Sequence, residues 1–142
     1  MNIKSFILNI SFFVSTSILI LGCSKSSVSQ EDSYYIKYQV ESSMPLGIIG
    51  TKVTNTITNE KNESINSVTS VGDVWETTIG PVKKGFVASV KSVKYNWTGE
   101  VENRLKILLR VQVSKNNGPF ALKKSDEPTT ARATAELQYV VE

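Results

Sequence analysis

The sequence predicts an all-β fold, a small antiparallel β-sandwich of about seven strands with immunoglobulin-like or transthyretin-like shape, after a separate N-terminal segment. Apolar and polar residues alternate in several runs, which is the period of a strand with one buried face. Turn residues separate these runs at the spacing of a sandwich, and no segment after residue 22 carries a helical period. Two half-buried sheets account for this alternation.

The first half of the domain predicts one strand, a hairpin and a short fourth strand. The hairpin arms are rich in Thr, Val and Ile, which favour a pleated surface, and the polar residues 59–64 form the turn between them. The fourth run ends at Gly80-Pro81. The predicted strands are residues 34–40, 48–58, 65–71 and 74–79.

The second half predicts three more strands. The clearest alternation lies in residues 105–113, where the apolar side chains of Leu105, Ile107 and Leu109 share one face. A short apolar piece at 120–122 precedes what we interpret as a polar loop, residues 123–128. The predicted strands are residues 86–95, 105–113 and 130–141.

The N-terminal segment resembles the signal peptides of bacterial lipoproteins. A positive start at Lys4 and an apolar run lead to Ile20-Leu21-Gly22-Cys23, in which a small residue precedes a cysteine. The alternative is a retained transmembrane helix, but a span needs about 20 predominantly apolar residues. Polar residues interrupt this shorter run, so we expect residues 1–22 to be removed and Cys23 to be lipidated.

Lipidation at Cys23 would make the membrane the first partner of this protein. The thiol takes a diacylglyceryl group as a thioether, and the freed α-amine is commonly acylated as well; burial contributes about 0.8 kcal/mol per CH₂. Residues 23–33 are polar and serine-rich and read as a flexible tether, followed by the domain at 34–142. Because Ser24 rather than Asp follows the cysteine, a didermal cell would place the protein in the outer membrane.

Composition argues against catalysis, metal binding and nucleic-acid binding. The chain has no histidine, which is the commonest general base and transition-metal ligand, and its one cysteine is assigned to lipid. We therefore expect no enzyme activity, no cofactor, no catalytic residues and no metal site. The formal charge of +3 is spread among interspersed acids and bases, so no nucleic-acid partner is expected.

Three aromatic residues are the candidates for contact with a ligand or partner. Trp97 lies in a predicted turn, Tyr95 precedes it, and Trp75 lies in the fourth predicted strand. Together they could form a stacking platform for a sugar or a lipid, whereas aromatic residues in sandwich domains more often fill or cap the core.

The order of several short motifs resembles a known family. Tyr34 to Val40 reads Tyr-x-Ile-x-Tyr-x-Val, and a Thr-rich strand, Val74-Trp75, Lys84-Gly85-Phe86-Val87-Ala88 and a closing Tyr139-Val140-Val141 follow. This order is similar to the soluble domain of small mycobacterial membrane proteins of the MmpS type, which accompany lipid-exporting transporters. The resemblance implies a β-sandwich and a role as a transport accessory. This chain has a lipoprotein signal where those proteins have a transmembrane helix.

Two functional hypotheses follow from these observations. The first is a lipid-anchored, non-catalytic interaction domain of the cell envelope that contacts a protein of a transport or export complex, since exposed sheet edges allow strand addition. The second is a surface lipoprotein that binds a glycan or a lipid through Trp97 and its neighbours.

Overall fold

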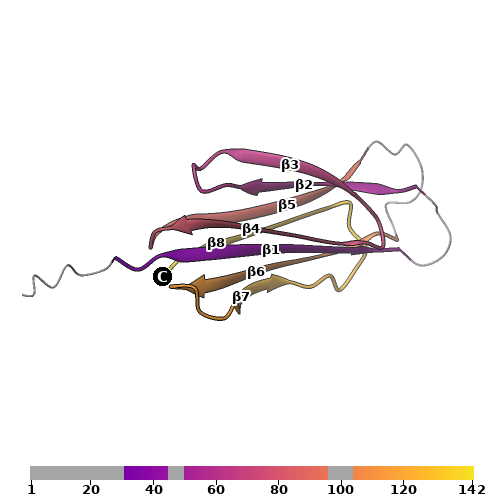
Figure 1. Ribbon diagram of the computed structural model, residues 1–142. Coiled ribbons are helices and arrows are strands. Elements are labelled where there is room, and N and C mark those ends of the chain that lie inside the picture. Colours follow the sequence, from indigo (N-terminus) through magenta and orange to yellow (C-terminus); the bar gives the residue numbers. More distant parts are fainter. Residues whose placement is uncertain (1–30, 45–49, 96–103) are drawn as a thin grey trace, which may run out of the picture. The chain divides into compact units, whose positions relative to one another are not determined.

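The computed structural model describes residues 31–44, 50–95 and 104–142, and its regular structure is entirely β-strand (Figure 1). The eight strands pair antiparallel in two sheets of four. Sheet 1 has the order β4-β1-β6-β7 and sheet 2 the order β3-β2-β5-β8. This confirms the predicted sandwich. The strands are β1 (Tyr34–Ser43), β2 (Lys52–Thr58), β3 (Ser64–Ser70), β4 (Val74–Val82), β5 (Val87–Tyr95), β6 (Lys106–Lys115), β7 (Ala121–Asp126) and β8 (Thr134–Val140).

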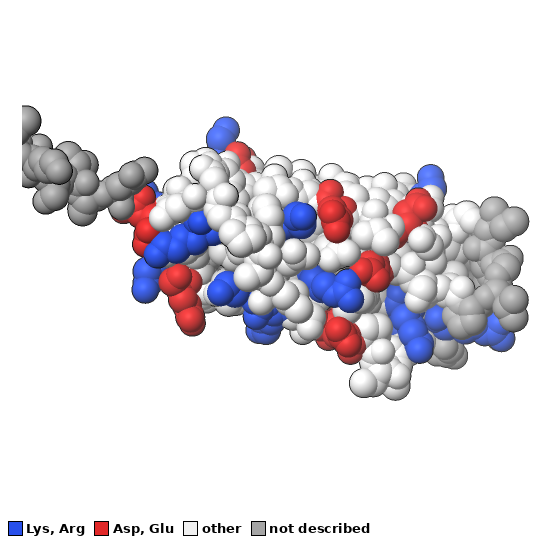
Figure 2. All heavy atoms as spheres, turned by 60° about the horizontal axis from the view of Figure 1, so that its bottom comes forward, with Lys and Arg blue, Asp and Glu red and all other residues white. Residues whose placement is uncertain are grey.

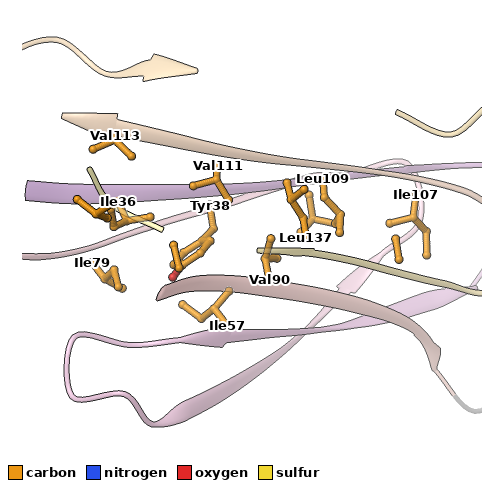
Figure 3. Packing of buried hydrophobic residues seen from close by; sticks show 14 of the residues in the cluster. Ile36, Tyr38, Ile57, Ile79, Val90, Ile107, Leu109, Val111, Val113 and Leu137 are labelled. Carbon is orange, nitrogen blue, oxygen red and sulfur yellow. The ribbon is translucent and has the colours of Figure 1, made fainter. Parts of the chain in front are cut away.

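The core lies between the inner faces of the two sheets. Side chains from β1 and β6 meet those of β2, β5 and β8, as Figure 3 shows for Ile36, Leu109 and Leu137. Tyr38 is fully buried at the centre of this layer, and its hydroxyl donates to the carbonyl oxygen of Thr58 at 2.9 Å. Burial raises the pKa of the Tyr38 phenol well above its ordinary value, because the phenolate would lose its hydration.

The alternating positions predicted for β1, β6 and β8 face the interior as expected. The differences lie at strand ends and at one edge. β4 continues past the predicted end at Gly80-Pro81 to Val82, since an edge strand tolerates proline. β8 begins at Thr134 instead of residue 130, because the backbone N–H of Arg132 bonds to Leu105 outside the ladder at 2.7 Å.

The predicted polar loop at 123–128 is wrong, because residues 123–126 belong to a strand, β7. β7 pairs with β6 from Ala121 to Asp126 and has a bulge where Lys123 is inserted. Its side chains are exposed on both faces at nearly every position. Without a buried face the strand shows no alternation, which is why periodicity did not reveal it.

The tether enters the domain at the end where β1 begins. The Ser33 N–H donates to Asn116 Oδ1 at 2.9 Å, and the Asn116 N–H donates to the Ser33 carbonyl at 2.8 Å. Asp32 forms an ion pair with Lys115 at 2.6 Å, and Glu31 pairs with Lys83 at 2.7 Å. Residues 31–33 of the expected tether are therefore bound to the domain.

Candidate functional site

The structure separates the aromatic residues that the sequence proposed as one contact site. Trp75 is half-buried, faces inward from β4 and packs against the hydrophobic core. Tyr95 is 44% exposed at the end of β5, on the outer face of sheet 2. Cys23 and Trp97 lie outside the described residues. Trp75 and Tyr95 therefore leave different sheets in different directions and form no common platform.

One hollow of about 400 Å³ lies where β1 ends and β4 and β6 begin. Its lining mixes acids such as Asp73 and Glu127 with bases such as Lys106 and Arg110. Arg110 is already paired with Glu41 in the same lining. Figure 2 likewise shows bases and acids interspersed over the face that it presents. Within the described ranges no group of three or more acidic, His or Cys residues could hold a metal ion. The hollow thus shows no charge selectivity for a ligand.

Edge strands are the second kind of place where a sandwich can bind, and three of the four edges here are protected. Natural proteins protect sheet edges with charges, prolines, bulges or covering groups. β7 carries Lys123, Lys124 and the bulge. The Lys124 Nζ also donates to the backbone carbonyl oxygen of Gln138 at 2.9 Å, and the ammonium group thus covers part of the β8 edge. β4 carries Pro81 and an irregular register with β1.

Among the residues that the structure describes, the fourth edge, β3, has none of these protections. Its sequence, Ser-Ile-Asn-Ser-Val-Thr-Ser, contains no charge and no proline. All seven residues pair with β2 in unbroken register from Ser64 to Ser70. Ile65 is 46% exposed and Val68 is 48% exposed, one on each face of the strand. β3 lies along the upper border of Figure 1, with β2 as its neighbour in the sheet.

The hairpin bonds identify which backbone groups of β3 are free. The Asn59 N–H donates to the Glu63 carbonyl at 2.8 Å, and the Val71 N–H donates to the Thr51 carbonyl at 2.9 Å. In an antiparallel ladder such pairs recur at every second residue, so the odd-numbered residues of β3 bond to β2. The even-numbered residues therefore turn their N–H and C=O groups to the open edge. These residues are Ser64, Asn66, Val68 and Ser70.

The inner side of β3 is polar and is held by one buried amide. Asn55 on β2 is fully buried, and its Nδ2 donates to Thr69 Oγ1 at 3.0 Å. Its Oδ1 accepts the Ser92 hydroxyl at 2.8 Å. Ser67, which stands opposite Asn55 in the ladder, has a buried Oγ with no hydrogen-bond partner among the described residues. β3 therefore has an unsatisfied hydroxyl in addition to its free backbone edge.

The sequence predicts residues 65–71 as a strand but does not predict its position at the edge of a sheet. A signal was present, because Ile65 and Val68 are three residues apart and thus lie on opposite faces. Ile65 and Val68 are the only large apolar residues of β3 as observed, Ser64–Ser70, and because they face opposite ways the strand cannot bury one face in a core. That pattern, together with the absence of charge, is what an unprotected edge requires.

Comparison with known proteins adds no relative from which a function could be transferred. No protein-family model, curated protein sequence or solved structure matches this chain. In the part of the chain that the structure describes, no helix is long and apolar enough to cross a membrane. The free edge of β3 is therefore characterised by its own chemistry.

Proposed function

We propose that this protein is a lipid-anchored, non-catalytic interaction module of the bacterial cell envelope that binds another polypeptide by strand addition along β3. The observation that carries the proposal is the bare edge itself. It offers the N–H and C=O groups of four alternate residues, in a strand without charge, proline or bulge. An extended peptide recognises such an edge through main-chain hydrogen bonds.

Main-chain bonds along β3 would supply affinity, and its side chains would supply selectivity. Each net hydrogen bond contributes about 0.5–1.5 kcal/mol. Ile65 on the inner face and Val68 on the outer face each add apolar surface that an incoming strand can cover. The expected partner segment is thus extended, uncharged at its centre and rich in β-branched residues, because charges there would lack partners on β3.

The lipid anchor would allow β3 to bind its partner even if the affinity of the isolated edge for a peptide is modest. Lipid on Cys23 holds the chain at a membrane, and residues 24–30 link the lipid to the part of the domain that begins at Glu31. A tethered module meets other membrane proteins at a raised effective concentration. The resemblance to transport accessory domains makes a transport or export complex the first place to search for the partner, in the outer membrane of a didermal cell.

A proline scan of two edges tests the proposal. Val68→Pro removes one N–H from the open edge of β3 and leaves the β2 ladder intact, because Val68 does not bond to β2. Val140→Pro is the matched control on β8, the other edge strand of the same sheet. The Val141 N–H bonds to the Phe86 carbonyl, so the N–H of the neighbouring Val140 points away from β5 to the open side of β8.

Crosslinking in intact cells followed by mass spectrometry gives the readout. We expect the wild type and Val140→Pro to show the same crosslinked species, and Val68→Pro to lose it while remaining folded and membrane-bound. An unchanged crosslinking pattern in Val68→Pro would show that β3 is not the contact edge. A loss of equal size in both variants would point to destabilisation instead of contact.

A further inference from the structure

We infer that the strand added to β3 is β3 of a second copy of this chain, which joins two sandwiches through one continuous eight-stranded sheet. The inference rests on the proposed role of β3 as a strand-addition edge and names its occupant. The order would run β8-β5-β2-β3 in one copy and continue as β3-β2-β5-β8 in the other. Identical strands that pair antiparallel are related by a two-fold axis, so the assembly closes as a dimer.

One register uses the whole free edge. When Ser67 of one copy stands opposite Ser67 of the other, Ser64 faces Ser70 and Asn66 faces Val68. These are the residues whose N–H and C=O groups point outward, so hydrogen-bonded pairs form along the full length of the strand. Shifting the register by two residues leaves one end of each strand without a partner. The register in which Ser67 stands opposite Ser67, called the symmetric register below, is therefore the most favourable one.

Ser67 supplies a second and independent argument. Its Oγ is buried and lacks a partner among the described residues, which is costly for a hydroxyl. In the symmetric register the two Ser67 residues form the central non-hydrogen-bonded pair, whose Cα atoms lie about 4.5 Å apart. One hydroxyl can then donate to the other after rotation about χ1, as cross-strand Ser and Thr pairs do. A second copy thus provides the group that this position lacks.

The absence of charged side chains makes β3 the edge strand best suited to pair with a copy of itself. Two-fold pairing brings each side chain close to a copy of its neighbours, so like charges on a strand oppose each other. β7 would set Lys123 and Lys124 against their own copies, while β8 carries Glu136 and β4 carries Glu76. β3 pairs with itself without any such repulsion.

A single cysteine at the axis tests the register. In the full-length protein in its native membrane, Cys23 is occupied by lipid, so Ser67→Cys introduces the one free thiol. Cα atoms about 4.5 Å apart fall within disulfide range, and mild oxidation should therefore convert most of the protein to a dimer. Ser70→Cys is the matched control on the same edge, because the two positions 70 lie roughly 20 Å apart in this register. It should stay monomeric alone and crosslink when co-expressed with Ser64→Cys.

A charge pair that is specific to this register provides the decisive variant. Asn66→Lys with Val68→Lys, added to Ser67→Cys, sets lysines opposite each other twice, and the disulfide dimer should fall about tenfold. Asn66→Lys with Val68→Glu sets lysine opposite glutamate and should restore it. Both double variants change the same exposed side chains, so recovery by the second excludes misfolding as the cause of the loss.

The outcomes distinguish this inference from the proposed function. If Ser67→Cys stays monomeric while Val68→Pro still abolishes crosslinks to another envelope protein, self-pairing is overturned and strand addition to a different partner stands. If neither variant has an effect, both are overturned. A dimer that forms equally in the Lys–Lys variant would reflect chance oxidation and would also overturn self-pairing.

Discussion

Asn55→Ala should destabilise the domain by about 2–4 kcal/mol, although the side chain it removes is small. Asn55 is fully buried and connects β2 to β3 through Thr69 and to β5 through Ser92. Without it the Ser92 hydroxyl, which is also fully buried, keeps no partner, and an unsatisfied buried donor costs about 1–3 kcal/mol. The lost bond to Thr69 adds about 0.5–1.5 kcal/mol. The total is a large fraction of the 5–15 kcal/mol typical of a folded domain.

Urea denaturation of residues 23–142 with Cys23→Ser, followed by far-UV circular dichroism, measures this loss. Thr56→Ala is the control, because Thr56 makes a cross-strand bond to Asn66 at 2.7 Å on the exposed outer face of the same strands. Water replaces that bond, so we expect a loss below about 1 kcal/mol. Adding Ser92→Ala to Asn55→Ala should recover about 1–2 kcal/mol, since it removes the unsatisfied hydroxyl. If Asn55→Ala cost no more than Thr56→Ala, the buried network would not hold β3 as we argue.

Four further predictions follow from other contacts. Gly80→Ala should destabilise the domain strongly in the same assay, because φ is +134° there and a Cβ would lie 2.8 Å from a backbone carbonyl oxygen of β1. Arg132→Lys should cost about 1–3 kcal/mol, since lysine cannot reproduce a guanidinium that bonds to backbone carbonyls of β6 and β7 at 3.1 Å each. The pKa of Asp32 lies below its ordinary 3.8 because Lys115 bonds to its carboxylate. The Asp32–Lys115 ion pair is therefore fully formed above that value and lost as pH falls through the folded-state pKa of Asp32, which a carboxyl NMR titration would follow. Cys23→Ala should stay unprocessed, whereas the intact mass of the wild type should show loss of residues 1–22 plus lipid; normal maturation of the variant would refute the lipoprotein interpretation.

The sandwich could be predicted because most of its strands bury one face against the core. β1, β6 and β8 alternate between buried and more exposed positions, and each alternation is visible in the sequence. β7 could not be predicted, since a strand exposed on both faces has no period to detect. Periodicity therefore reports burial, and it finds a strand only where burial follows the pleat.

The candidate site escaped prediction for a related reason. Aromatic residue types are visible in the sequence and predict a binding site there, yet Trp75 packs on the core and Tyr95 stands apart from it. The free groups of β3 belong to the backbone, which every residue carries, so no side-chain pattern identifies them. Only the pairing of β3 with β2 alone, and the register of that pairing, assigns the open N–H and C=O groups to the even-numbered residues.

The bareness of β3 is informative because the same domain protects its other edges by different means. β7 uses lysines and a bulge, β4 a proline, and β8 the Lys124 ammonium group bound to its backbone. A long unprotected edge strand promotes aggregation. Because the domain protects three of its edges, the unprotected edge of β3 indicates a binding role. Two-fold pairing removes the hazard as well as using the edge, because the dimer buries both copies of β3 and leaves only the protected edges β4, β7 and β8 exposed. Variants that block pairing, such as Asn66→Lys with Val68→Lys in residues 23–142 with Cys23→Ser, should therefore yield a monomer that stays in solution, since the new lysines then protect the edge that the partner no longer covers.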